Sequence, residues 1–155
     1  MDKISVIESL KSRLKSQLDR ALAAVESAAE GATGDDAKAE SKYDTRGLEA
    51  SYLAAGQAGQ AEELGRVFGV IERFEFRDFS NPGEPIDVGA LVKTDFEGEE
   101  DWYLIAPGGG GLECESNTGE SITILATGAL LASKLIGKTA GEQLEGSKMT
   151  IAEVI

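Results

Sequence analysis

The chain has 155 residues, of which 28 are acidic and 15 basic, and this gives a net charge of −13 and a pI near 4.4. A charge of this sign repels phosphate backbones, so independent binding of DNA or RNA is disfavoured and a basic protein surface is the better partner. The absence of histidine excludes Ser–His–Asp and Cys–His catalysis, and a single cysteine, Cys114, excludes an internal disulfide.

The charge is divided unevenly along the chain. Residues 1–77 hold 11 basic and 14 acidic residues, a net charge of −3, whereas residues 78–155 hold 4 basic and 14 acidic residues, a net charge of −10. The two halves are therefore predicted to be different structural parts. No apolar run approaches the roughly 20 residues that span a bilayer, and the first residues lack a signal-peptide core, so we expect a cytoplasmic protein with no membrane association.

Residues 4–28 predict a long amphipathic helix, because apolar residues recur there at heptad spacing. The stripe consists of Ile4, Ile7, Leu14, Leu18, Ala21, Val25 and Ala28, with Lys11 at the equivalent position between them. Residues 30–37 carry two glycines, a threonine and two aspartates, which predicts a turn.

A second helical pattern runs from about residue 40 to residue 74 and contains five glycines, each of which costs up to roughly 1 kcal/mol of helix propensity relative to alanine. Packing against the first helix would offset this cost, and small residues would allow close approach. The residues expected to do so are Ala50, Ala54, Ala55, Gly56 and Ala58. We therefore predict an antiparallel coiled-coil hairpin.

The periodicity changes after a connector rich in turn residues, Asn81-Pro82-Gly83 among them. Short β-type runs separated by glycines and acidic turns predict strands at 88–92, 102–106, 122–125 and 149–154, with a further strand around 112–115. The run Pro107–Gly111 lacks the Lys-Ser/Thr of a phosphate-binding loop and predicts a turn. One helix is expected at 128–136, ended by Gly137. The predicted fold class is α+β, with a helical hairpin followed by a small antiparallel sheet and one short helix.

Several segments resemble the Gre (GreA/GreB) family of bacterial transcript-cleavage factors: Val88–Val92, Tyr103-Leu104-Ile105, and above all Ala129–Glu142 with its Gly137-Lys138 and Gly141-Glu142. The resemblance implies a coiled-coil hairpin at 1–76 with its tip at about 30–42, a connector at 77–85 and an FKBP-like RNA polymerase-docking domain at 86–155. It also implies a monomeric elongation factor that enters the polymerase secondary channel and acts on paused or backtracked complexes. Such a factor is not itself an enzyme: at most it stimulates RNA cleavage by the polymerase, and it meets the RNA 3′ end only through the polymerase.

The resemblance places the assisting carboxylates of the tip at Asp35, Asp36 and Glu40, which would hold Mg²⁺ only within the polymerase complex, with no cofactor bound to the chain alone. Lys42, Tyr43 and Arg46 would contact RNA or the channel wall. In the family an acidic residue follows the Gly-Asp pair more closely than Glu40 follows Gly34-Asp35 here, and Ser41 replaces an asparagine. This departure indicates a divergent branch and argues against strong stimulation of cleavage.

Three alternatives stay open at this point. The first is a channel-blocking regulator of the same family without cleavage activity. The second is an FKBP-like prolyl isomerase or chaperone, although the aromatic residues available for its pocket are only Phe79, Phe96, Trp102 and Tyr103. The third is a coiled-coil adaptor with an unrelated partner, and whether the helical stripes also dimerise is not decided by the pattern.

Overall fold

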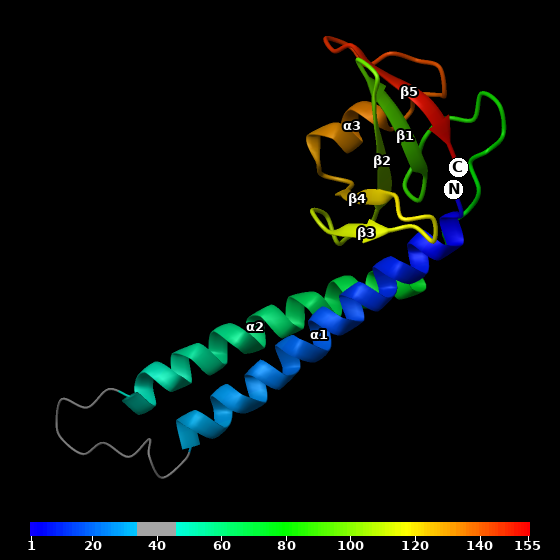
Figure 1. Ribbon diagram of the computed structural model, residues 1–155. Coiled ribbons are helices and arrows are strands. Elements are labelled where there is room, and N and C mark those ends of the chain that lie inside the picture. The colour runs from blue at the N-terminus through cyan, green and yellow to red at the C-terminus, as the bar shows by residue number, and fades with distance from the viewer. Residues whose placement is uncertain (34–45) are drawn as a thin grey trace. The chain divides into compact units, whose positions relative to one another are not determined.

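The structure is a computed structural model that describes residues 1–33 and 46–155. Two long helices are followed by five strands and one short helix, which confirms the predicted α+β class (Figure 1). The chain divides into two compact units: one consists of Leu14–Phe68, and the other of Met1–Arg13 together with Gly69–Ile155. No helix among the described residues is long and apolar enough to cross a bilayer.

The unit formed by Leu14–Phe68 is a pair of antiparallel helices, as predicted. It contains most of α1 (Lys3–Thr33) and of α2 (Arg46–Arg73), which lie side by side (Figure 1). Leu14 and Ala21 on α1 and Ala61 on α2 are buried, and an ideal Cβ on Gly65 would lie 3.8 Å from Leu18 Cδ1. The apolar stripe of each helix therefore provides the packing of this pair.

The predicted stripe of α1 is wrong in its first two turns. Ile4 is 68% exposed, whereas Lys3, Val6 and Leu10 are buried. From Leu14 onward the prediction holds, because Leu14 and Ala21 are buried there. The shift arises because the first turns of α1 belong to the other unit, where Lys3 contacts Arg77 of the connector and Ile155, which follows β5.

The small residues expected to line the helix contact are only partly where the sequence suggested. Ala50 and Ala54 are half-buried, but Ala55, Gly56 and Ala58 are exposed. The inward face of α2 instead passes through Ala50, Ala54 and Ala61 at spacings of four and seven residues, which is the spacing of one helical face. Gly56 and Gly59 thus face away from this stripe, whereas Gly65 lies against Leu18 of α1.

The second unit is built on a five-stranded sheet with the strand order β3-β4-β2-β1-β5. The strands are β1 (Leu91–Phe96), β2 (Glu99–Ala106), β3 (Glu113–Glu115), β4 (Ser121–Ala126) and β5 (Met149–Val154). The first strand begins later than the predicted run 88–92, because Gly89 takes a φ of 101° and the Ala90 N–H donates to the Asp87 oxygen in a turn.

The sheet is mixed, which corrects the predicted antiparallel sheet in one pair of strands. β1 pairs antiparallel with both β2 and β5, and β3 pairs antiparallel with β4, but β2 and β4 are parallel. After β2 the turn at 107–111 carries the chain past the neighbouring strand position to β3, and the β3–β4 hairpin then returns β4 into the space beside β2. A strand inserted in this way must run in the direction of β2.

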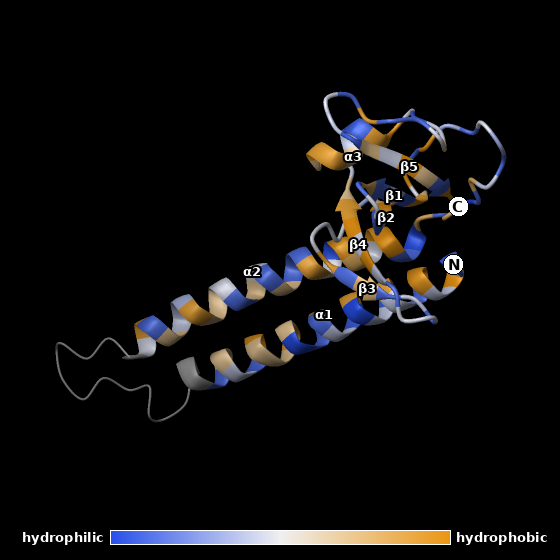
Figure 2. Ribbon diagram, turned by 45° about the horizontal axis from the view of Figure 1, so that its top comes forward, coloured by the Kyte–Doolittle hydropathy of each residue, from blue (hydrophilic) through white to orange (hydrophobic). Residues whose placement is uncertain are grey.

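The hydrophobic core of this unit lies between one face of the sheet and α3 (Leu130–Leu135), which packs on that face (Figure 1). In Figure 2, much of β4 and α3 has the orange colour of hydrophobic residues. The buried residues of the core come from the connector, the segment before β1, three strands, α3 and the loop after it: Phe79, Ile86, Ala90, Val92, Ile105, Ala132, Leu135, Leu144, Ile151 and Val154. Gly137, with a φ of 85°, follows α3 as predicted.

A buried lysine connects three separated parts of this unit. The Lys3 ammonium donates hydrogen bonds to the backbone oxygens of Arg77, at 2.5 Å, and of Ile155, at 2.8 Å. It also lies 5.0 Å from the centre of the Phe79 ring, and the Arg77 guanidinium lies 3.8 Å from the same ring. Burial lowers the pKa of Lys3 from 10.5 to about 8, and the Asp78 carboxylate offsets part of that effect.

We expect replacement of Gly110 by alanine to destabilise the fold. Its Cβ would lie 2.8 Å from the Ala126 Cβ and 3.0 Å from the Ala126 nitrogen, so β4 would have to shift, at a cost of about 1–3 kcal/mol. Gly128→Ala is the matched control, because nothing lies within 4 Å of its Cβ. Urea denaturation of both variants checks this, and equal stability of the two would contradict the described turn.

The pH dependence of stability should reveal the Lys3 contact. Between about pH 8 and pH 10.5 the unfolded chain keeps the proton that folded Lys3 has already lost, so Lys3 makes the free energy of unfolding rise with pH over this window. Wild type should therefore gain stability relative to Lys3→Met as the pH rises from 8 to 10.5. Urea denaturation across this range measures the difference, and a constant or falling difference would show that Lys3 keeps its ordinary pKa.

Candidate functional site

The residues predicted to act at the hairpin tip lie between the two long helices in sequence. α1 ends at Thr33 and α2 begins at Arg46, the last of the predicted RNA-contact or channel-contact residues. Asp35, Asp36, Glu40, Lys42 and Tyr43 lie outside the described residues, so their roles stay predictions. Three carboxylates in one short segment are the oxygen donors that Mg²⁺ prefers. Within the described parts of the chain, no group of three potential ligands could hold a metal ion.

A polar groove runs between α1 and α2 inside the helical unit. It encloses about 400 Å³ and is lined by Gln17, Arg20, Ala21, Ala24, Gln57, Gln60 and Leu64. Arg20 Nε donates to the Ser16 backbone oxygen at 3.1 Å, which places the guanidinium beside α1. Three amide side chains along a groove can both donate and accept hydrogen bonds, so this surface suits a polar partner better than an apolar ligand.

The outer face of α3 presents an apolar side chain to solvent beside two lysines. Ala132 and Leu135 point into the core, so Leu130 and Lys134, two and one positions before them, lie on the opposite side of the helix. Leu130 is 75% exposed. A cavity of about 370 Å³ adjoins this face and is lined by Ser133, Lys134, Ile136, Lys138 and Glu145. The face therefore combines an exposed leucine with a cavity lined by two lysines and a glutamate.

The segment after α3 is held in place by local hydrogen bonds. The Gly137 N–H donates to the Ile86 oxygen, and the Ile86 N–H donates to the Lys138 oxygen. The Glu142 carboxylate accepts from the Thr139 N–H at 2.6 Å, and this bond, with the Lys138 ammonium at 3.3 Å, holds the pKa of Glu142 below its usual range. These contacts explain the Gly-Lys and Gly-Glu pairs: they anchor the end of α3 to the connector and so orient its outer face.

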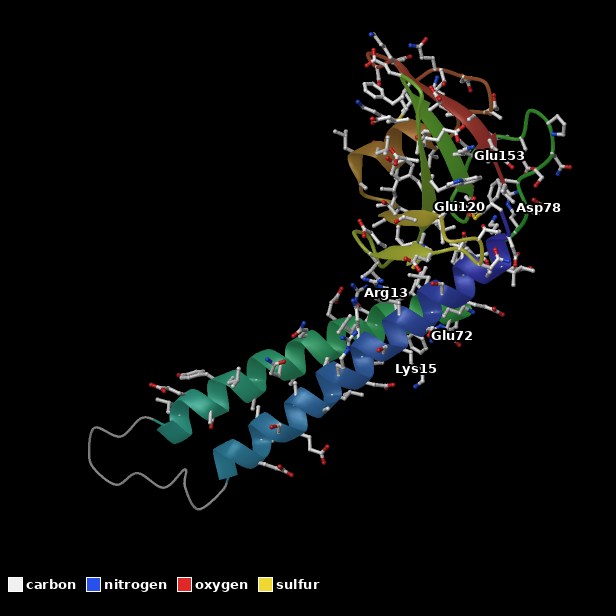
Figure 3. All side chains as sticks on the ribbon, in the orientation of Figure 1. Arg13, Lys15, Glu72, Asp78, Glu120 and Glu153 are labelled. Atoms are coloured by element: carbon white, nitrogen blue, oxygen red, sulfur yellow. The ribbon has the colours of Figure 1, made fainter. Side chains whose placement is uncertain are left out.

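The sheet unit carries most of the negative charge. Figure 3 labels Asp78, Glu120 and Glu153 on this unit. Lys93 pairs with Glu100 at 2.7 Å, 5.8 Å from the centre of the Trp102 ring, and the hydrogen bond to Glu100 raises the pKa of Lys93. In the acidic run 97–101, Glu97 lies in the β1–β2 turn with a φ of 54° and pairs with Lys148. Two lysines among several carboxylates leave this surface acidic, which suits a basic protein surface.

Cys114 is buried, as the sequence suggested. Burial raises the pKa of its thiol, although a hydrogen bond to Ser9 and the charge of Arg13 act in the opposite direction. A cavity of about 300 Å³ adjoins the thiol and is lined by Ser9, Arg13, Glu113, Cys114, Glu115 and Ser121. A thiol with a raised pKa is a poor nucleophile at neutral pH, so the geometry favours a packing role.

The aromatic residues that might have formed a prolyl-binding pocket are used elsewhere. Phe79 is 1% exposed and holds Lys3 and Arg77 over its ring, and Trp102 is buried under Lys93. Phe96 is 40% exposed in the acidic hairpin. Phe79 and Trp102 are therefore unavailable to line an open pocket for a peptide.

Sequence reasoning missed Leu130 as a surface residue. The segment 130–136 is apolar on nearly every side, so its periodicity does not tell the buried face from the exposed one. The only available signal was Lys134, four residues after Leu130, because residues at this spacing share a helical face.

Comparison with known proteins gives structural similarities only. No protein-family model and no curated protein matches the chain. The chain is similar to the crystal structure of GreA factor homolog 1 (Gfh1) of Thermus thermophilus, with 18% identity, 94% of each chain covered and a TM-score of 0.37. A second structure, of the transcription factor Gfh1, shares 15% identity over 94% of this chain and 93% of that chain, with a TM-score of 0.37. Thermus aquaticus Gfh1 shares 18% identity over 95% of this chain and 94% of that chain, with a TM-score of 0.35. Similarity at this level carries no argument about function, which has to come from the residues of this chain.

Proposed function

We propose that the chain is a cytoplasmic transcription elongation factor that binds RNA polymerase at its secondary channel and acts on paused or backtracked complexes. The observation that carries the proposal is the order of parts. A pair of antiparallel helices is joined by a segment holding Asp35, Asp36 and Glu40, and an acidic α+β unit with the Gly137–Glu142 segment follows. The sequence resemblance to the Gre family supports the same reading.

The outer face of α3 is the proposed docking surface. Leu130 supplies an apolar anchor, and the cavity beside Lys134 and Lys138 supplies a recess for a partner side chain. Interface energy concentrates in a few such anchors surrounded by polar contacts. The negative charge of the same unit attracts a basic protein surface and speeds the encounter, whereas it repels the phosphates of nucleic acid.

The segment joining the helices is proposed to assist the polymerase. Asp35, Asp36 and Glu40 would hold Mg²⁺ within the polymerase complex, where a metal ion stabilises developing charge on phosphate oxygens. Lys42, Tyr43 and Arg46 would contact RNA or the channel wall. The chain itself is not proposed as an enzyme, because the polymerase performs the cleavage.

Leu130→Asp should weaken binding to RNA polymerase by roughly tenfold or more, because it places a charge at the proposed apolar contact. The side chain is already exposed, so the fold should be unaffected. Asn117→Asp is the matched control, since it adds the same charge at an exposed position of the same unit. Titration of labelled polymerase measures both affinities, and an equal effect of the two variants would exclude α3 as the dock.

Asp35→Asn, Asp36→Asn and Glu40→Gln test the joining segment. We expect weak stimulation of RNA cleavage in backtracked complexes, reduced roughly tenfold or more when these acids are neutralised, with polymerase binding retained. Gel analysis of the cleaved transcript gives the readout. If wild type slows RNA synthesis without any acid-dependent cleavage, the chain is a channel-blocking regulator instead.

A further inference from the structure

We draw no further inference here: the strongest candidate, the polar groove between α1 and α2 that is lined by Gln17, Arg20, Gln57 and Gln60, carries none, because nothing in the structure shows what covers it.

Discussion

The unit that contains the sheet depends on a buried ammonium group. The Lys3 ammonium donates hydrogen bonds to the backbone oxygens of Arg77 and Ile155, residues that are 74 and 152 positions away in sequence. Removing this charge from water is costly, and two carbonyl dipoles, an aromatic ring and a nearby carboxylate offset only part of the cost, so the pKa of Lys3 is lowered to about 8. Because Ile155 exchanges two backbone hydrogen bonds with Leu91, the same contact ties the start of α1 to the β1–β5 edge of the sheet.

The two units differ in how charge is distributed over their surfaces. The sheet unit is strongly acidic, and the outer face of α3 combines an exposed leucine with a cavity lined by Lys134, Lys138 and Glu145. On α2, residues 50–61 carry no charged side chain.

The glycines of the chain serve two different purposes. Gly89 and Gly110 are required by their neighbours, since a Cβ on Gly89 would lie 3.1 Å from the Phe74 ring and one on Gly110 would press on β4. Gly56 and Gly59 have open space around them, and their cost to helix stability has no compensation in the described structure. The composition shows many glycines in both halves, but only the coordinates separate these two groups.

The sequence by itself determined the α+β class, the two long helices, the strands after residue 90 and the end of α3 at Gly137, because hydrophobic period and turn residues are local properties. It did not determine which face of the first turns of α1 is buried, because the groups that hydrogen-bond buried Lys3 are distant in sequence. Nor did it show that β4 runs parallel to β2, because strand direction follows from where the β3–β4 hairpin returns. The exposure of Leu130 on α3, and of Leu48 and Tyr52 on α2, was likewise decided by tertiary packing, which selects one face of a helix that is apolar or neutral on several sides.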